Sequence, residues 1–220
     1  MSATTRQDIV RRIGEIGIVP VVRAASAAEA VAVGDAIVAG GVDALEITMT
    51  VPGAVEVMKE AVKRYGERLL IGAGTVVDAE QARACIAAGA RFIVSPIVDE
   101  PTIAECRRAD VAVLPGALTP TEVVRAWRAG GDLVKVFPCS AVGGASYIKA
   151  LKAPLPQIPL VPTGGVTLDT IAGFFAAGAT AVGVGADLCN VSAVRLGHAH
   201  QITDAARAYV RAVRSARKAA

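Results

Sequence analysis

Short apolar runs alternate with longer amphipathic segments along most of the chain. The short runs are rich in Val, Ile and Leu and predict buried strands, whereas the longer segments repeat apolar residues at helical spacing. The predicted strands are Ile18–Arg23, Asp43–Met49, Leu69–Ala73, Arg91–Ser95, Val111–Leu114, Leu133–Phe137, Leu160–Thr163 and Ala181–Val184. The predicted helices include Arg6–Ile16, Ala27–Ala39, Ala54–Tyr65, Ala79–Ala88, Pro120–Ala129 and Leu168–Ala177. Alternating strands and helices are typical of α/β proteins with a parallel sheet.

A repeated junction indicates how many strand–helix units the chain contains. At four places a helix ends at a glycine and a β-rich run follows. The four glycines lie 49, 41 and 48 residues apart, at Gly40, Gly89, Gly130 and Gly178. Each period has room for two strand–helix units, so we expect eight strands that close into a (β/α)8 TIM barrel.

The remaining segments fit one barrel. No linker, low-complexity tract or charge block divides the chain, so we expect residues 1–220 to form a single domain. The helix predicted over Arg6–Ile16 is expected to cap the bottom of the barrel. An open, doubly wound sheet is the alternative, but it does not explain an eightfold repeat.

The composition suits a large core and excludes some classes of function. Hydrophobic residues make up 53% of the chain and charged residues 20%. The net charge of +3 is too small to indicate binding to nucleic acid or to an anionic membrane surface. The apolar region from Ile18 to Val42 is interrupted by Arg23, Glu29 and Asp35, so it does not predict a membrane span.

Cysteine and histidine do not suggest a ligand set. The four cysteines are Cys85, Cys106, Cys139 and Cys189. They show neither a close pair nor metal-ligand spacing, which favours free thiols in a reducing cytoplasm. His198 and His200 are expected on an exposed loop within Cys189–Gln201, a segment to which the sequence assigns no role. Because Met1–Gly17 shows no targeting segment, we expect a cytoplasmic protein. Because no cluster of ligand residues is visible, we expect neither a metal nor another cofactor.

Lys135 is the most informative single residue, because it lies within an apolar predicted strand. Lysine is rarely buried, and desolvation favours its neutral, nucleophilic form. An isolated lysine of this kind is more often one that extends its amine to solvent. The polar residues expected near Lys135 favour the reactive interpretation.

Alternation along the strands predicts which side chains face the inside of the barrel, where the carboxyl ends of the strands carry the active site. The residues expected to share this inner face are Val19, Val21 and Arg23; Ala44, Glu46 and Thr48; Ile71, Ala73 and Thr75; and Leu133, Lys135 and Phe137. Glu46 and Arg23 also suit a structural ion pair, and Thr75 an ordinary strand-end cap. Together, a lysine nucleophile, a glutamate for proton transfer, and an arginine and a threonine for a carboxylate indicate a Schiff-base enzyme acting on a keto acid.

Glycines follow the last two predicted strands. Thr163-Gly-Gly165 comes after the seventh strand, and Gly183-Val-Gly185 ends the eighth. Glycines there allow backbone N–H groups to approach an anion, and the loops after strands seven and eight of this barrel often bind phosphate. We therefore expect Thr163, Gly164, Gly165 and Gly185 to bind substrate. Thr167 is predicted to be the N-cap of the next helix.

Six motifs, in order, resemble those of a known enzyme family. They are Glu46-Ile-Thr-Met-Thr-Val-Pro52, Ile71-Gly-Ala-Gly-Thr-Val76, Ile93-Val-Ser-Pro96, Leu114-Pro-Gly116, Val134-Lys-Val-Phe-Pro138 and Val161-Pro-Thr-Gly-Gly-Val166. The family is that of 2-keto-3-deoxy-6-phosphogluconate (KDPG) and 4-hydroxy-2-oxoglutarate (KHG) aldolases. The resemblance extends to the 6-phosphogalactonate aldolases and spans about Ile18 to Asp187.

The resemblance implies roles for individual residues. The family's Schiff-base lysine corresponds to Lys135 and its proton-transferring glutamate to Glu46. Its binding positions correspond to Thr75 for the pyruvate carboxylate, Pro96 and Phe137 around the pyruvyl group, and Gly164 and Gly165 for phosphate. Members are typically homotrimers that need no metal.

Two departures from the family pattern concern the ends of the substrate. Many members have an arginine for the carboxylate where this chain has Thr50, and we expect Arg23 to supply that charge. Some members have a phosphate-binding serine where this chain has Ala186, so phosphate binding would rest on backbone donors.

The expected activity is that of a class I aldolase that reversibly cleaves a 2-keto-3-deoxy-4-hydroxy acid to pyruvate and an aldehyde. KDPG, its galactonate epimer and KHG are the expected substrates, and neither stereochemistry nor phosphorylation follows from the sequence. One alternative is a sugar-phosphate isomerase or epimerase on the same barrel, with Glu46 as base and Lys135 as electrostatic stabiliser. The other is a non-catalytic protein that binds sugar-acid phosphates.

Overall fold

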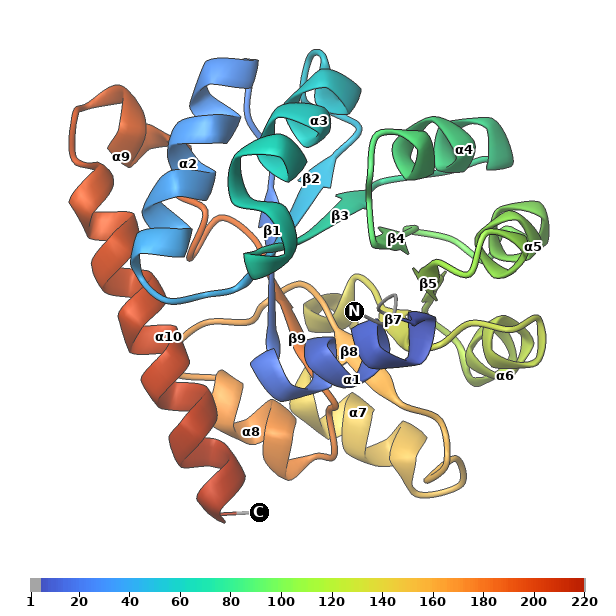
Figure 1. Ribbon diagram of the computed structural model, residues 1–220. Helices are drawn as coiled ribbons and strands as arrows, with labels where there is room; N and C mark the ends of the chain where they lie inside the picture. The colour runs from blue at the N-terminus through green and yellow to red at the C-terminus, as the bar shows by residue number, and fades with distance from the viewer. Residues whose placement is uncertain (1–4, 220) are drawn as a thin grey trace.

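Short strands lie at the centre of the molecule and helices surround them in the computed structural model, which describes residues 5–219 (Figure 1). The strands are β1 (Ile18–Val22), β2 (Ala44–Thr48), β3 (Leu70–Gly74), β4 (Phe92–Val94), β5 (Ala112–Leu114), β6 (Gly116–Ala117), β7 (Val134–Val136), β8 (Leu160–Pro162) and β9 (Val182–Val184). The α-helices are α1 (Arg6–Ile16), α2 (Ala27–Ala39), α3 (Ala54–Tyr65), α4 (Ala79–Ala87), α5 (Glu100–Arg108), α6 (Pro120–Arg128), α7 (Ala145–Lys152), α8 (Ile171–Ala176), α9 (Val191–Arg195) and α10 (Ala199–Ala219). Two 3-10 turns are η1 (Gly66–Arg68) and η2 (Cys139–Val142). Residues 1–4 and 220 of the predicted domain lie outside the described residues.

The strands form two parallel sheets. The first has the order β5-β4-β3-β2-β1-β9 and the second β6-β7-β8. β5 and β6 are consecutive pieces of chain on either side of Pro115, whose carbonyl accepts from Lys135 N at 2.9 Å. A parallel bridge between Thr163 and Gly183 links the chain after β8 to β9. The predicted α/β fold with a parallel sheet is confirmed.

The elements predicted from periodicity are present. Each of the eight predicted strands matches an observed strand, with bounds that differ by at most one residue at either end. Three predicted helices have the same bounds as α1, α2 and α3. The helix predicted over Leu168–Ala177 is shorter, because Thr167 Oγ1 accepts from Thr170 N at 3.3 Å and caps a separate turn. Thr170, not Thr167, is the N-cap of α8, so that prediction is wrong.

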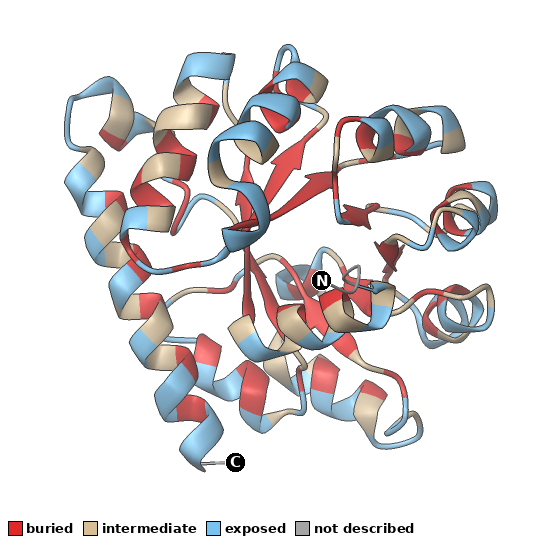
Figure 2. Cartoon of the chain, in the orientation of Figure 1, coloured by how far each residue is buried: buried red, intermediate tan, exposed pale blue. Residues whose placement is uncertain are grey.

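Alternating strand residues pack into two separate clusters, and Figure 2 shows the strands as the most continuously buried elements. The inner cluster joins Ile9 and Ile13 of α1 to Val19, Ala44, Leu70, Phe92, Val94, Ala112, Leu114, Leu133, Val161 and Ala181. The outer cluster packs the other strand face against the helices and includes Val22, Leu45, Ile47, Ile93, Val113, Val134, Val136 and Val182. The inner and outer residues of the first, second and sixth predicted strands follow the predicted alternation.

The alternation predicted for the third strand is wrong. Ile71 and Ala73 belong to the outer cluster, whereas Leu70 belongs to the inner one. A side chain at Gly72 would collide with the ring of Phe92, an inner residue, so the inward positions of β3 are largely glycine. The strand therefore contributes space to the interior, and alternation does not explain the position of Thr75.

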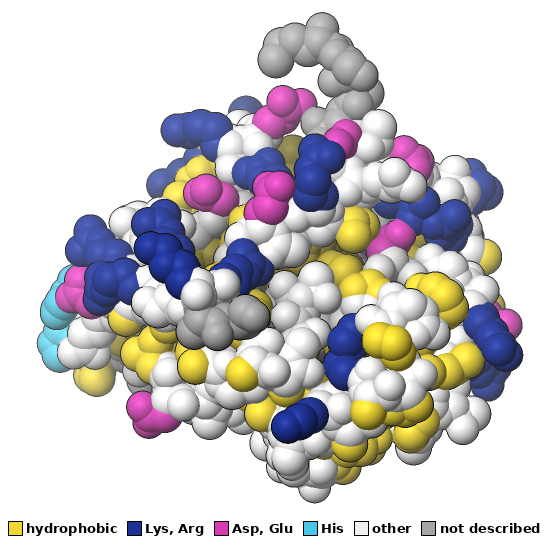
Figure 3. All heavy atoms as spheres, turned by 90° about the horizontal axis from the view of Figure 1, so that it is seen from below, with side chains coloured by type: hydrophobic (Ala, Val, Ile, Leu, Met, Phe, Trp, Pro, Cys, Tyr) yellow, Lys and Arg dark blue, Asp and Glu magenta, His cyan; other side chains and the backbone are white. Residues whose placement is uncertain are grey.

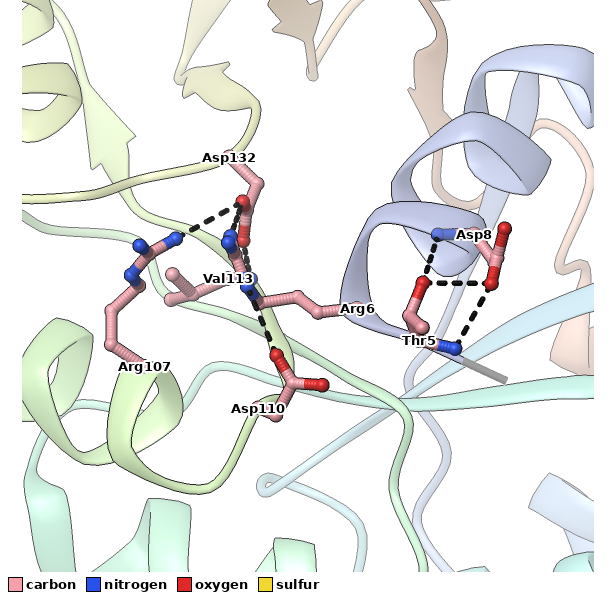
Figure 4. Close-up of polar contacts among 7 residues, drawn as sticks. All are labelled: Thr5, Arg6, Asp8, Arg107, Asp110, Val113 and Asp132. Atoms are coloured by element: carbon pink, nitrogen blue, oxygen red, sulfur yellow. Dashed lines mark hydrogen bonds and ion pairs between the residues drawn. The ribbon is translucent and has the colours of Figure 1, made fainter. Parts of the chain in front are cut away.

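Charged side chains attach α1 to the amino ends of neighbouring strands (Figure 4). Arg6 pairs with Asp132, and its Nε lies 3.5 Å from Asp110 Oδ1. Asp132 also accepts from Val113 N at 3.0 Å and lies 3.8 Å from Arg107 Nη1. Burial raises the pKa of Asp132, although the hydrogen bond and both arginines act against it.

Charged side chains of both signs occur on the surface (Figure 3). In Figure 3, Lys and Arg side chains lie among Asp and Glu side chains on the face shown. His198 and His200 are both exposed, but only His198 lies in the predicted loop, because His200 belongs to α10. None of the described helices combines the length and the apolar sequence needed to cross a bilayer.

Candidate active site

A cavity of about 580 Å³ opens where β1, β7, β8 and β9 end. Its walls include Val21 beside Arg23, Phe137 after β7, and the loops after β8 and β9. Six residues predicted to bind substrate line it: Arg23, Phe137, Thr163, Gly164, Gly165 and Gly185. The structure therefore brings these residues together at the carboxyl ends of the strands, as the sequence predicts.

Lys135 lies beside Phe137 of the cavity wall and is not itself among the residues that line the cavity. It lies in β7 between Gly116 of β6 and Val161 of β8, and only 2% of its surface is exposed. Its Nζ lies 5.1 Å from the centre of the Phe137 ring, which lines the cavity. The amine therefore lies over an aromatic face that forms part of the cavity wall.

Glu46 is the second buried charged residue, with 2% exposure, and its strand partner Val21 lines the cavity. Burial raises the pKa of Glu46, while the positive charges of Lys135 and Arg23 act to lower it. Among the described residues, Glu46 Oε1 has no hydrogen-bond partner. The carboxyl group lies where a side chain at Gly74 would be, since a Cβ there would come within 2.6 Å of Glu46 Cδ.

Arg23 and Thr75 occupy the ends of β1 and β3 in different ways. Arg23 is exposed and lines the cavity, and its charge affects the buried Glu46. Thr75 is half-buried at φ 58°, a rare backbone conformation for a β-branched residue. Such strain is common at functional sites, but Thr75 is not among the residues that line the cavity.

Pro96 does not line the first cavity. It lines a second cavity of about 350 Å³ together with Gly116, Ala117 and Phe137. Phe137 therefore lines two hollows, one with Pro96 and the other with the glycine loops.

The glycine loops bring backbone close to the cavity. Gly164 and Gly165 have φ of 96° and 73°, values that favour glycine, and a Cβ at Gly165 would lie 2.5 Å from Ser140 Cβ. Thr163 is 8% exposed, and its side chain occupies the space that a side chain at Gly183 would need. Both loops can therefore present backbone N–H groups that longer side chains would block.

Sequence reasoning missed the wall that follows β9. Asp187, Asn190 and Ser192 line the cavity, so the unassigned segment Cys189–Gln201 begins in the site. An ion pair between Arg195 Nε and Glu29 Oε1 at 2.7 Å fastens α9 to α2. The position of the segment directly after the last strand was the available signal, because that end of the barrel carries the site.

Comparison with known proteins covers most of the chain. A family model described as KDPG and KHG aldolase matches residues 9–205. A 2-dehydro-3-deoxy-6-phosphogalactonate aldolase from Escherichia coli strain K12 is 36% identical over 204 residues, which are 92% of this chain and 97% of the relative. A 2-dehydro-3-deoxy-phosphogluconate aldolase from Treponema pallidum strain Nichols is 34% identical over 168 residues, 76% and 80% of the two chains.

A solved structure extends the comparison to the fold. KDPG aldolase from Legionella pneumophila, captured with pyruvate as a covalent carbinolamine intermediate, superposes with a TM-score of 0.84 at 26% identity. The superposition covers 94% of this chain and 98% of that one. The resemblance carried by the motifs is confirmed: the chain belongs to the KDPG and KHG aldolase family.

Proposed function

We propose that the protein is a class I aldolase that reversibly cleaves a 2-keto-3-deoxy-4-hydroxy acid to pyruvate and an aldehyde. The observation that carries this proposal is that Lys135 and Glu46 are both buried, and that the charge of the lysine acts on the carboxyl group. Each lies next to a residue of the cavity wall, Phe137 for Lys135 and Val21 for Glu46. The names of the curated relatives favour KDPG or its galactonate epimer as substrate.

Lys135 and Glu46 have complementary roles in the proposed reaction. The neutral amine of Lys135 attacks the C2 ketone to give a carbinolamine, which loses water to form an iminium ion. Glu46 takes the proton of the C4 hydroxyl, the C3–C4 bond breaks, and its electrons move into the iminium to form an enamine as the aldehyde leaves. Protonation at C3 and addition of water then release pyruvate and free Lys135. A carboxyl group with a raised pKa suits this exchange of protons near neutral pH.

The other predicted residues bind the two ends of the substrate. Arg23 and Thr75 hold the pyruvate carboxylate, and Pro96 and Phe137 pack around the pyruvyl carbons. Thr163 and the backbone at Gly164, Gly165 and Gly185 bind the distal end. Support for this division comes from the cavities, because Phe137 lines both the hollow at Pro96 and the hollow at the glycine loops.

We also propose that residues 1–220 form one closed (β/α)8 barrel with α1 as its bottom cap. Support comes from the bridge between Thr163 and Gly183, and from the inner cluster, in which Ile9 and Ile13 of α1 contact residues of the strands. The assembly is a homotrimer, as is typical of the family. Four buried free cysteines support a reducing, cytoplasmic setting.

Trapping with borohydride tests the mechanism. The protein is incubated with pyruvate and sodium borohydride, digested, and analysed by mass spectrometry for a reduced adduct on Lys135. Lys135→Ala is expected to lose both the adduct and turnover, whereas Lys149→Ala, on the nearby helix α7, keeps both. Active protein with an unmodified Lys135 would refute the mechanism.

The same experiment separates the two alternatives. An isomerase or epimerase that uses Glu46 as base would turn over a sugar phosphate without inactivation by borohydride. A binding protein would retain its ligand in Lys135→Ala and have no turnover to lose. Neither alternative is favoured, because the curated relatives over most of the chain are aldolases.

A further inference from the structure

One buried side chain contacts both loops that line the distal part of the cavity. The hydroxyl of Tyr209, on α10, donates to Asp187 Oδ2 in the loop after β9. It also lies 3.4 Å from the carbonyl oxygen of Val166, in the loop after β8. Tyr209 has no exposed surface, and both Val166 and Asp187 line the cavity.

The tyrosine hydroxyl is a permanent donor in this position. Burial raises the pKa of Tyr209, and the negative charge of Asp187 raises it further. The phenol therefore keeps its proton at working pH. A hydrogen bond from a neutral donor to a carboxylate is also stronger than one between neutral groups.

Asp187 would oppose an anionic substrate if its carboxylate faced the cavity. The residue is exposed, and beside it Ala186 offers no hydroxyl to an anion. Recognition of a distal phosphate would then depend on the backbone N–H groups of the glycine loops. A carboxylate free to move beside these donors would repel the phosphate.

We propose that Tyr209 is a positioning residue for the distal end of the substrate: its hydroxyl holds the Asp187 carboxylate away from the anionic group. Tyr209 touches no reacting atom and acts through Asp187. This inference rests on the proposed function, because it requires a substrate that extends from Lys135 to the loops after β8 and β9.

Tyr209→Phe removes the hydroxyl and keeps the buried ring. The variant is assayed with 2-keto-3-deoxygluconate, with its 6-phosphate, and by borohydride trapping of pyruvate. We expect KM for the phosphorylated substrate to rise about tenfold, with kcat, KM for the unphosphorylated substrate and trapping unchanged. The increase in KM should shrink as salt is added, because exposed charges are screened.

Two further variants separate this effect from a loss of packing. In Tyr209→Phe combined with Asp187→Asn, the freed side chain carries no charge, so KM for the phosphorylated substrate should return to near the wild-type value. Tyr65→Phe removes an equivalent bond to Asp35, between α3 and α2 and away from the cavity, and should change none of these constants.

The inference is overturned if Tyr209→Phe leaves KM unchanged, raises it equally for both substrates, or keeps its defect in the combined variant. Failure of the proposed function is distinct, because the wild-type protein would then trap no pyruvate on Lys135. A wild-type protein that traps pyruvate, with a Tyr209→Phe variant that binds both substrates normally, refutes the inference alone.

Discussion

Gly74 should be essential because the carboxyl group of Glu46, the proposed proton acceptor, occupies the space of its missing side chain. In Gly74→Ala the new Cβ would lie 2.5 Å from Glu46 Cγ and 2.6 Å from Cδ, and closer still to Oε1. Carbon atoms normally approach to about 3.5 Å, so the carboxyl group must move by roughly 1 Å. The backbone at Gly74 has no left-handed φ, so alanine is otherwise compatible with β3.

A displacement of this size acts mainly on catalysis. Misplacing a reacting group by about 1 Å can cost on the order of a hundredfold in rate, and overpacking typically costs about 1–3 kcal/mol of stability. We therefore expect kcat for pyruvate release to fall about a hundredfold in Gly74→Ala, while pyruvate is still trapped on Lys135 by borohydride. A coupled assay with lactate dehydrogenase measures the rate, and thermal unfolding verifies the fold.

Gly173→Ala provides the matched control for this experiment. Gly173 lies in α8, and its added Cβ would meet Ala145 Cβ at 3.6 Å, an ordinary contact. Its kcat should equal that of the wild type. A Gly74→Ala variant with wild-type kcat would show that the position of the Glu46 carboxyl group does not limit the reaction.

Two further predictions concern buried charges. Burial raises the pKa of the Glu46 carboxyl group above 4.5, so the folded protein favours the protonated form. The stability that this preference contributes is present below pH 4.5 and is lost as the pH rises through the raised pKa. Glu46→Gln should therefore gain in melting temperature over the wild type as pH rises above 4.5, and a difference that does not vary with pH would contradict this. Asp132→Ala leaves the largely buried Arg6 with only the exposed Asp110 as an ion-pair partner, and should lower the free energy of unfolding in urea by about 3 kcal/mol. Asp204→Ala removes the partner of Arg207 in an exposed ion pair, and should change the free energy of unfolding by less than about 1 kcal/mol. Equal losses in the two variants would contradict a larger contribution from the buried pair.

Periodicity predicts the elements of this fold because each strand lies between a buried interior and a layer of helices. The strand of Lys135 shows this clearly, since Leu133 belongs to the inner cluster while Val134 and Val136 belong to the outer one. The alternation predicted for the third strand was wrong because Gly72 and Gly74 carry no side chain. The strand Leu70–Gly74 also contains no polar residue that would distinguish one face from the other. Apolar residues alone do not reveal which side is the interior.

The distal wall of the site was not predictable by the same reasoning. Asp187 follows the last strand in an irregular loop, where hydrophobic spacing carries no information about direction. Tyr209 fits the apolar face of α10, and its hydroxyl contact with Asp187 joins residues 22 positions apart. A polar contact of this kind depends on the tertiary fold. That Lys135 and Glu46 face the same interior, in contrast, could be inferred from their strand positions alone.

The arrangement around Glu46 is unfavourable for stability, and this supports a role in binding substrate. An unsatisfied buried acceptor such as Glu46 Oε1 costs about 1–3 kcal/mol, and a residue strained like Thr75 costs a similar amount, about 1–3 kcal/mol. A structural ion pair with Lys135 would satisfy the carboxylate, yet no salt bridge within 4.0 Å joins the two among the described residues. A bound 4-hydroxy keto acid would supply what is missing, since its C4 hydroxyl can donate to Oε1 while its ketone meets the lysine. The unpaired oxygen is therefore better explained as a proton acceptor awaiting substrate than as part of a structural core.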